Sequence, residues 1–327
     1  MTTFLTDADV RAVHDWPAAV AALRRAYGHL DDTDAFPPRM MARNGNRLWL
    51  RILGGVSRET GMMGAKLIAA SVNSRRVSYL IPLFDPETVD LVALLDAHSI
   101  TGFRTAATSA LAVDVLAPRR PLQVAMIGSG FEAQNHLRAL ASARELSAVT
   151  VFSPTPSSRE RFVEVFAGEG TAVRAVSTPQ DAVAGADVVV CAARSHDESP
   201  IMHGDWIKPG MTVVSIGSTL PEQRELDASC ITQADLVVAD QVEEVAHDTG
   251  DMIAAKEAGT DFSGKLVSLA AVVSGQTPGR RSEDDVVVYK SVGAAVQDLA
   301  VAQMCAERAT ELGLGTTLPV TLAPITK

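Results

Sequence analysis

The segment Val124–Leu140, VAMIGSGFEAQNHLRAL, decides the fold of this chain. It has the pattern of a short apolar strand, a glycine turn and a helix, with Gly128, Gly130 and Ala133 giving G-x-G-x-x-A where the strand ends. Glycines at such a turn let the backbone approach a pyrophosphate, which then lies on the free N–H groups of the helix N-terminus. The segment predicts a dinucleotide-binding turn; an ordinary tight turn of a flavodoxin-like domain is the alternative.

The region after this turn predicts a parallel sheet. Short apolar runs recur from residue 122 on, most of them separated by helical segments: LQVAMIG, AVTVFS, AVRAV, DVVVCAA, TVVSIG, ADLVVAD and DVVVYKS. Strands that are apolar on both faces are typical of a parallel sheet with helices on both sides. We therefore expect an α/β fold, with a doubly wound, Rossmann-type parallel sheet over residues 118–299.

The region before the turn has a different pattern. Thr6 and Asp9 predict a capping-box-like start for a short first helix, and Asp15 precedes a second helix. The apolar face of this second helix consists of Val20, Leu23, Tyr27 and Leu30. Five strand-like runs follow without helices between them, which predicts an antiparallel sheet: RMMARNG, RLWLRILGG, GAKLIAASV, VSYLIPLFD and VDLVALLDA. We expect residues 1–117 to form a β-rich domain that ends in a helix.

Length and composition limit the class of protein. A chain of 327 residues suggests about two domains, and its net charge of −10 gives no reason to expect binding to nucleic acid or anionic lipid. It has no apolar run long enough to cross a bilayer and no signal-peptide pattern, so we expect no membrane association and a cytoplasmic location. The three cysteines lie far apart and the seven histidines form no metal-binding motif. This predicts reduced structural thiols and no metal site.

The end of the second strand bears on the choice of cofactor. An acid there would bond the ribose 2′-hydroxyl of NAD and repel the 2′-phosphate of NADP. Here the sequence is VFSPTPSSRER, so Ser153, Pro154, Thr155 and Arg159 stand near that position. Hydroxyls with an arginine suit a phosphate, which favours NADP over NAD; the alternative is that these residues only cap the next helix. The other residues expected at the dinucleotide lie in the glycine turn, on the preceding helix and after two later strands: Thr105, Ser129, Phe131, Glu132, Ala192, Ala193, Ile216 and Gly217.

Several stretches together resemble the ornithine cyclodeaminase/mu-crystallin family: GAKLIAAS, ITGFRTAATSALA, MIGSGFEAQNHLRAL, ADVVVCA, WIKPGMTVVSIGS, QREL and KSVGAAVQD. The resemblance implies a Rossmann-type domain inserted in a β-rich, substrate-binding domain, which the C-terminal helix of about residues 300–327 completes. It also implies homodimerisation through the β-rich part, and small amino, imino or keto acids as substrates. By resemblance, Ser291, Val292 and Gly293 flank the nicotinamide.

The resemblance also implies roles for three basic residues. Arg39 of PPRM and Arg104 of FRTAA match carboxylate ligands, and Lys66 of GAKL matches a catalytic lysine. A guanidinium can hold a carboxylate by two parallel hydrogen bonds, and a buried lysine can polarise or protonate an imine. Without the resemblance, Arg39 reads as a surface residue after a proline turn, and Arg104 reads equally well as part of a salt bridge. Asp298, on the last helix, is a candidate partner for a basic residue of this site.

One departure from the family selects among its activities. Cyclodeaminases of the family carry an aspartate in a segment that here reads GSTLPEQREL, where Thr219 takes its place. A threonine cannot serve as a carboxylate base. We therefore expect an NAD(P)H-dependent reductase of imino or ketimine acids. The alternatives are an alanine-dehydrogenase-like amino acid dehydrogenase, a cyclodeaminase with bound NAD, and a non-catalytic mu-crystallin-like binding protein.

Overall fold

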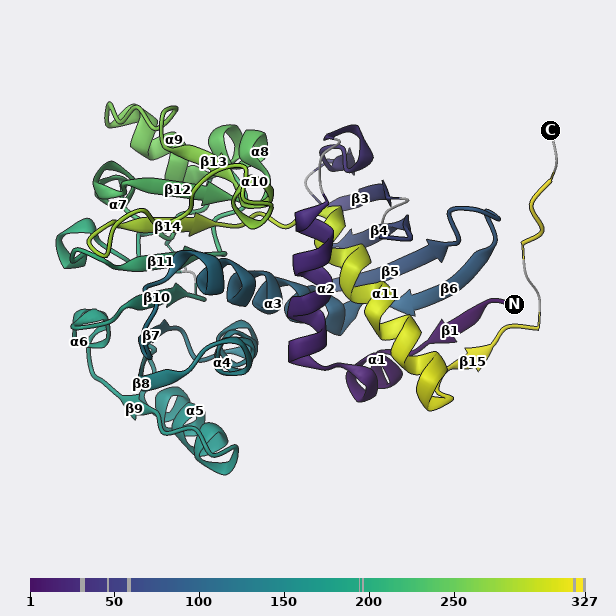
Figure 1. Ribbon diagram of the computed structural model, residues 1–327, viewed down its shortest axis with the longest axis horizontal. Coiled ribbons are helices and arrows are strands. Elements are labelled where there is room, and N and C mark those ends of the chain that lie inside the picture. Colours follow the sequence, from purple (N-terminus) through teal and green to yellow (C-terminus); the bar gives the residue numbers. More distant parts are fainter. Residues whose placement is uncertain are drawn as a thin grey trace. The chain divides into compact units, whose positions relative to one another are not determined.

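The computed structural model describes residues 1–29, 33–45, 47–57, 60–193, 195, 197–319 and 322–325. The chain divides into two compact units, Met1–Thr105 with Ala294–Lys327, and Ala106–Gly293 (Figure 1). These boundaries fall at 105/106 and 293/294, whereas the sequence analysis placed them at 117/118 and 299/300. The difference arises because the first crossing lies inside one continuous helix, α3 (His98–Leu116), whose sequence carries no break.

The first unit contains a seven-stranded sheet in the order β15-β1-β6-β5-β4-β3-β2. Its strands are β1 (Thr3–Leu5), β2 (Met40–Asn44), β3 (Leu48–Ser57), β4 (Met62–Ser71), β5 (Arg76–Phe84), β6 (Leu91–Asp96) and β15 (Thr316–Thr317). From β2 to β6 every neighbouring pair is antiparallel, as predicted. Two further strands at one edge were not predicted: β1 pairs parallel with β6, and β15 pairs antiparallel with β1. Strands of two or three residues show too little alternation to be recognised in a sequence.

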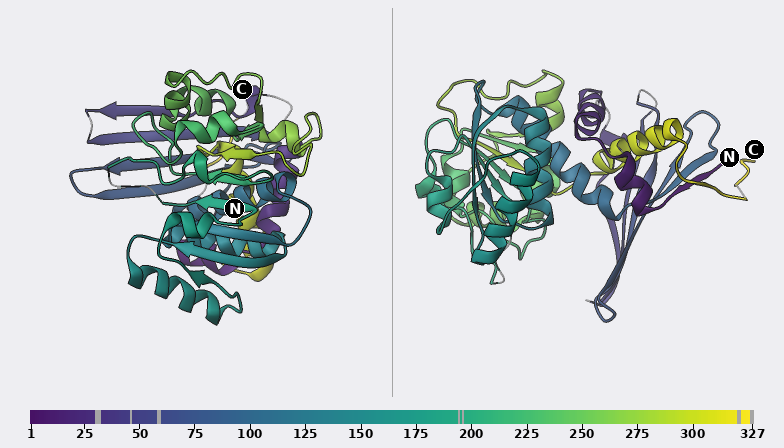
Figure 2. Two further views of the ribbon diagram at one scale, coloured as in Figure 1. Left: turned by 90° about the vertical axis from the view of Figure 1, so that its left-hand side faces the viewer. Right: turned by 90° about the horizontal axis from the view of Figure 1, so that it is seen from below.

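Helices of the first unit lie on one face of this sheet (Figures 1 and 2). They are α1 (Asp7–Val13), α2 (Trp16–Gly28), the 3-10 helix η1 (Thr33–Ala35) and α11 (Ala295–Leu312). The capping box of Thr6 and Asp9 is present, and Asp15 caps α2, both as predicted. On α2, Val20, Leu23 and Tyr27 are buried as expected, while Leu30 lies outside the described residues. α11 packs against β3, β4 and β5, so it carries C-terminal residues to the core of the N-terminal sheet.

The second unit contains an eight-stranded sheet in the order β13-β12-β14-β11-β10-β7-β8-β9. Its strands are β7 (Leu122–Ile127), β8 (Leu146–Phe152), β9 (Arg174–Ala175), β10 (Val188–Cys191), β11 (Thr212–Ser215), β12 (Leu236–Ala239), β13 (Leu266–Ser268) and β14 (Val287–Lys290). All pairings are parallel, which confirms the predicted doubly wound α/β fold. The sequence analysis missed β13, because its three residues run directly into an apolar helix.

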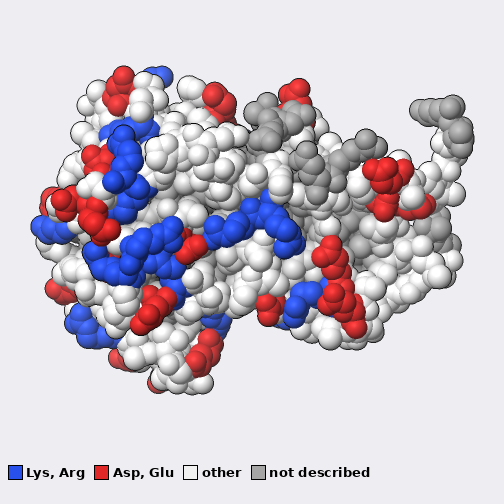
Figure 3. Space-filling model, in the orientation of Figure 1, with Lys and Arg blue, Asp and Glu red and all other residues white. Residues whose placement is uncertain are grey.

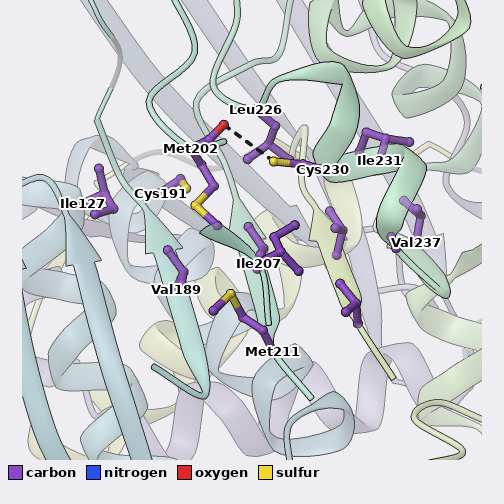
Figure 4. Close-up of a cluster of buried hydrophobic side chains, with 14 of the residues drawn as sticks. Ile127, Val189, Cys191, Met202, Ile207, Met211, Leu226, Cys230, Ile231 and Val237 are labelled. Carbon is purple, nitrogen blue, oxygen red and sulfur yellow. Dashed lines mark hydrogen bonds between the residues drawn. The ribbon is translucent and has the colours of Figure 1, made fainter. Parts of the chain in front are cut away.

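Helices and buried side chains cover this parallel sheet. Besides α3, the helices are α4 (Phe131–Ala143), α5 (Pro156–Gly168), α6 (Pro179–Val183), η2 (Gly204–Trp206), α7 (Ala228–Gln233), α8 (Val242–Asp248), α9 (Gly250–Glu257) and α10 (Leu269–Val273). Figure 4 shows part of the core, in which Cys191 and Cys230 lie among aliphatic side chains and the Cys230 thiol donates to the Met202 carbonyl at 3.5 Å. All three cysteines are buried and unpaired, as the sequence predicts.

Two surface properties bear on the expected partners. Within the described residues, no helix combines the length and apolar character that a bilayer span needs. On the face drawn in Figure 3, lysine and arginine side chains have aspartate and glutamate side chains beside them. The described part of this face therefore presents a mixed surface charge.

Candidate functional site

Lys66 is a buried cation in the middle of the first unit's sheet. It lies on β4 opposite Leu53 of β3, and only 1% of its side chain is exposed. Side chains alternate along a strand, so Gly64, Lys66 and Ile68 share the face on which α11 packs. Burial of an ammonium is costly unless acceptors surround it. The Lys66 ammonium donates to the Thr101 hydroxyl at 2.8 Å and to Asp298 Oδ1 at 2.9 Å.

Arg104, on α3, contacts the same oxygen as Lys66, Asp298 Oδ1. Its Nε lies 3.0 Å from Asp298 Oδ1, and its Nη1 donates to Gln297 Oε1 at 2.7 Å. The Gln297 amide in turn donates to the Tyr27 hydroxyl at 2.9 Å. The expectation that Asp298 pairs with a basic residue is confirmed. No role in this site was predicted for Thr101, Gln297 or Tyr27. Thr101 and Gln297 stand inside the motifs ITGFRTAATSALA and KSVGAAVQD, whereas Tyr27 was expected only on the apolar face of α2.

Among the described residues that contact one another here, this cluster has two cations and one anion. Lys66 and Arg104 are both cations, and Asp298, which is fully buried, is the anion that both of them contact. Burial lowers the pKa of Lys66 to about 8, Asp298 acts to raise it, and the neighbouring Arg104 lowers it further. Lys66 is therefore mostly protonated at neutral pH, yet close enough to its pKa to release a proton.

Arg39 is placed by the strand register. It is half-buried and directly precedes Met40 of β2, which pairs with Ile52 of β3. The next residue of β3, Leu53, pairs with Lys66. Arg39 thus lies at the level of Lys66 but two strands away, and its role as a carboxylate ligand stays a prediction.

The glycine turn of the second unit has the backbone that a pyrophosphate requires. Gly128 has φ +123°, and a Cβ on it would lie 2.6 Å from the Ala192 carbonyl oxygen, so no other residue fits there. Gly130 is the N-cap of α4, with open space where a Cβ would be and no cap hydrogen bond from a described side chain. The first N–H groups of α4 therefore remain available to an anion. This backbone fits a dinucleotide.

The loop between β8 and α5 holds the residues expected to select the cofactor. Arg159 Nη1 donates to the Ser153 carbonyl at 2.8 Å, and its guanidinium lies 5.8 Å from the centre of the Phe152 ring. Thr155 is the N-cap of α5 and is exposed, yet its hydroxyl accepts no cap hydrogen bond from the described residues. Thr155 therefore stands at the N-cap position of α5, but its hydroxyl makes no capping hydrogen bond within the described residues.

Three segments follow neighbouring strands at the carboxyl edge of the parallel sheet. Ala192 and Ala193 follow β10, Ile216 and Gly217 follow β11, and Ser291, Val292 and Gly293 follow β14. Asp240, at the end of β12, organises the last segment. It accepts from the Ser291 hydroxyl at 2.7 Å and from the Gly293 amide at 2.8 Å. The sequence analysis missed Asp240, which looks there like any acid after a strand.

A second buried charge cluster lies beneath the segment after β11. Glu225 Oε2 accepts from the Ser215 hydroxyl at 2.6 Å and from the Gly217 amide at 2.9 Å. The Lys290 ammonium donates to the Ser215 hydroxyl at 2.8 Å and lies 3.0 Å from Asp251 Oδ2. Burial raises the pKa of Glu225 to about 7, against the opposing effect of Lys290. No motif in the sequence predicts this cluster.

Some expected residues are engaged elsewhere. The Thr105 hydroxyl donates to the Thr101 carbonyl at 2.6 Å, within α3, so its predicted contact with cofactor phosphates stays a prediction. Thr219 donates to Gln223 Oε1 from its amide at 2.9 Å, and its hydroxyl lies 3.2 Å from the same atom. Position 219 therefore carries an uncharged side chain that is bonded to Gln223. Among the described residues, no three histidine, cysteine, aspartate or glutamate side chains are grouped to hold a metal ion.

Comparison with known proteins agrees with this geometry. Residues 12–313 match the ornithine cyclodeaminase/mu-crystallin family. The chain is 33% identical to the ketimine reductase mu-crystallin of Mus musculus over 234 residues, 72% of this chain and 70% of that protein. It is 26% identical to a Δ1-pyrroline-2-carboxylate reductase of Bacillus cereus over 271 residues, 81% of this chain and 82% of that protein. The Δ1-pyrroline-2-carboxylate reductase of Thermococcus litoralis, solved with NADH and L-proline, superimposes with a TM-score of 0.87 at 25% identity, covering 97% of this chain and all of that one.

Proposed function

Since the chain belongs to the ornithine cyclodeaminase/mu-crystallin family, we propose that it is an NAD(P)H-dependent reductase of small 2-imino carboxylates. The reaction adds hydride to the carbon of C=N and a proton to its nitrogen, which yields an amino acid. The observation that carries the proposal is the buried cluster of Lys66, Asp298 and Arg104, with two cations on one carboxylate oxygen. The names of the relatives, a ketimine reductase and pyrroline-2-carboxylate reductases, support the same chemistry.

The residues of the first unit have distinct roles in this proposal. The substrate carboxylate would be held by the guanidinium groups of Arg104 and Arg39, which can each give two parallel hydrogen bonds. Among the described residues, Lys66 donates only to Thr101 and Asp298, so one of its three N–H groups is left for the substrate. That N–H would protonate the imine nitrogen. A pKa of about 8 suits this transfer near neutral pH, because the donor is charged but not strongly held in that state.

The second unit would hold the dinucleotide, which supplies the hydride when bound. Gly128, Gly130 and the first turn of α4 would bind its pyrophosphate. Arg159, with the hydroxyls of Ser153 and Thr155, favours NADPH over NADH, since these groups suit a 2′-phosphate and no acid opposes it. The segments after β10, β11 and β14 would line the nicotinamide end.

Two other activities are less well supported. A cyclodeaminase would need a carboxylate base at position 219, where the threonine instead bonds to Gln223. A ligand-binding protein without catalysis would have no need of a buried lysine whose pKa lies near neutrality. An amino acid dehydrogenase differs only in the direction of the reaction and in the requirement for ammonia, so the substrate assay separates it.

We also propose that the protein is a homodimer through the outer face of the first unit's sheet. By register, Met40, Leu48, Leu50 and Val56 all point to the face opposite α11, and each is more than a third exposed. Large exposed apolar side chains on a single sheet face are typical of an interface. A second copy of the same face would cover them. Analytical ultracentrifugation tests this proposal, because a homodimer has twice the mass of the single chain.

The test of the catalytic proposal is oxidation of NADPH or NADH, followed by absorbance. Substrates are cyclic 2-imino acids and 2-oxo acids with and without ammonia or methylamine. Wild-type protein should oxidise NADPH with the imines, and Lys66→Met should lose at least about a hundredfold in kcat/KM, since general acid catalysis contributes about that much. Lys256→Met, at an exposed lysine of α9, is the matched control and should match wild type. Absence of oxidation with every substrate, or equal rates for Lys66→Met and wild type, would refute the proposal.

A further inference from the structure

Asp298 has no part in binding the substrate or the dinucleotide as described so far, yet both cations of the cluster meet on its Oδ1. Its Oδ1 lies 2.9 Å from Lys66 Nζ and 3.0 Å from Arg104 Nε, and its side chain is fully buried. We propose that Asp298 is a positioning residue for the proposed reduction, which aims the Lys66 ammonium and the Arg104 guanidinium and keeps the transferable proton on Lys66. This inference rests on the proposed function.

The geometry fixes both cations from one helix. Gln297 and Asp298 are neighbours at the start of α11. Gln297 Oε1 accepts a hydrogen bond from Arg104 Nη1, and Asp298 Oδ1 forms an ion pair with Arg104 Nε at 3.0 Å. The orientation of the guanidinium plane is therefore set by two consecutive residues. The Tyr27 hydroxyl accepts from the Gln297 amide and so fixes that side chain as well. α11 thus determines which edge of Arg104 faces a carboxylate ligand.

The same carboxylate determines the direction of Lys66. The Thr101 hydroxyl donates its own proton to the Ala97 carbonyl at 3.3 Å, so towards Lys66 it is an acceptor. With Thr101 and Asp298 Oδ1 as the two acceptors, the position of the third N–H follows from tetrahedral geometry. Loss of either acceptor would let the ammonium rotate. Loss of Asp298 would also remove a charge.

The charges that face Lys66 come from several elements. Asp298 on α11 favours the protonated lysine, and Arg104 on α3 and Arg51 on β3 oppose it. The Tyr79 ring of β5 lies 5.6 Å from the Lys66 ammonium. Burial is the largest influence and lowers the pKa of Lys66 to about 8. Without the carboxylate, all remaining influences from charged groups would lower the pKa of Lys66 further, so Lys66 would lose its proton at a lower pH than in the intact protein.

Asp298 should therefore set the pH above which kcat/KM for the reduction falls, here called the pH limit. In each turnover the imine carbon gains the hydride, the imine nitrogen gains the proton of Lys66, and the neutral lysine regains a proton from solvent. The value of kcat/KM for reduction should therefore fall above about pH 8, as Lys66 loses its proton. In Asp298→Asn this fall should begin at least about one pH unit lower, which is the usual size of the effect of an adjacent opposite charge.

The experiment measures kcat/KM against pH for wild type, Asp298→Asn and Thr101→Val. Thr101→Val is the matched control, because it removes an acceptor of Lys66 without removing a charge. It should lower the rate and leave the pH of the fall within about half a unit of wild type. Asp298→Glu, which keeps the charge but displaces it, covers the case that Asp298→Asn does not fold; it should likewise lower the rate and keep the limit. The inference is overturned if kcat/KM of Asp298→Asn falls at the same pH as that of wild type. It is also overturned if Thr101→Val lowers this pH as much as Asp298→Asn does.

A second readout needs no catalysis. The native pKa of Lys66 is below its ordinary value of 10.5, so the free energy of unfolding should rise with pH between about 8 and 10.5. In that window the unfolded chain binds a proton that the native protein lacks. The rise should be absent in Lys66→Met and should begin at lower pH in Asp298→Asn. A wild type without reductase activity refutes the proposed function, whereas an unchanged window in Asp298→Asn refutes the role of Asp298 alone.

Discussion

Glu225→Gln tests whether the ionised Glu225 carboxylate lowers the free energy of unfolding of the second unit. Glu225 lies beneath the segment that follows β11. The substitution keeps the shape of the side chain and removes its charge. Glu225 is fully buried, its Oε2 accepts from Ser215 and from the Gly217 amide, and its Oε1 has no hydrogen-bond partner among the described residues. Asp251 opposes its ionisation, and Lys290 favours it. Of these influences, burial is the largest.

The magnitude follows from the pKa of Glu225, which rises from its ordinary value of 4.5 to about 7. The native protein therefore keeps a proton between these two pH values that the unfolded chain has lost. Stability contributed by the protonated carboxyl is complete below pH 4.5 and is lost as the pH rises through 7. Since one pH unit is worth about 1.4 kcal/mol, the loss amounts to about 3 kcal/mol.

The assay compares the unfolding of wild type and Glu225→Gln from about pH 4 to 8. Other carboxyl groups titrate in the same range, so the informative quantity is the difference between the two proteins. For a unit of this size, about 3 kcal/mol corresponds to roughly 6–12 °C in melting temperature. Glu225→Gln should gain that much relative to wild type as the pH rises. Glu222→Gln, at an exposed position of the same loop, is the control and should show no such gain. Parallel curves for wild type and Glu225→Gln would refute the reasoning.

Three further predictions concern the dinucleotide and the dimer. Gly128→Ala should lower stability by about 1–3 kcal/mol and abolish the rise in melting temperature on adding NADPH, because φ is +123° and the new Cβ meets the Ala192 carbonyl oxygen at 2.6 Å. Arg159→Leu should reduce the ratio of kcat/KM for NADPH over that for NADH at least about tenfold, since one charged hydrogen bond is worth about 1.5–3 kcal/mol; an unchanged ratio would assign the 2′-phosphate to other residues. Leu50→Asp should give a folded monomer in analytical ultracentrifugation, and a dimer of wild-type mass would place the interface elsewhere.

Local backbone requirements made much of the fold readable from the sequence. The glycine turn at Gly128, the capping box at Thr6 and the buried strands around Val189 each depend on residues close together in the chain. The functional importance of Lys66 could also be read from its neighbours, because a buried lysine in an apolar strand is costly unless it has a partner or a role in the site. The short edge strands β1 and β15 were beyond this reasoning, because only pairing with neighbours distinguishes them from loops.

The sequence by itself determined that this chain has a parallel α/β unit with a dinucleotide turn and a separate antiparallel sheet that carries a buried lysine. Only the tertiary structure decided what that lysine meets. Lys66 and Asp298 are 232 residues apart in the chain and 2.9 Å apart in space. Periodicity reports which face of an element is buried, but the charge that compensates a buried ion depends on which elements pack there. For the same reason, the partners of Glu225 and its raised pKa could not be read from the order of residues.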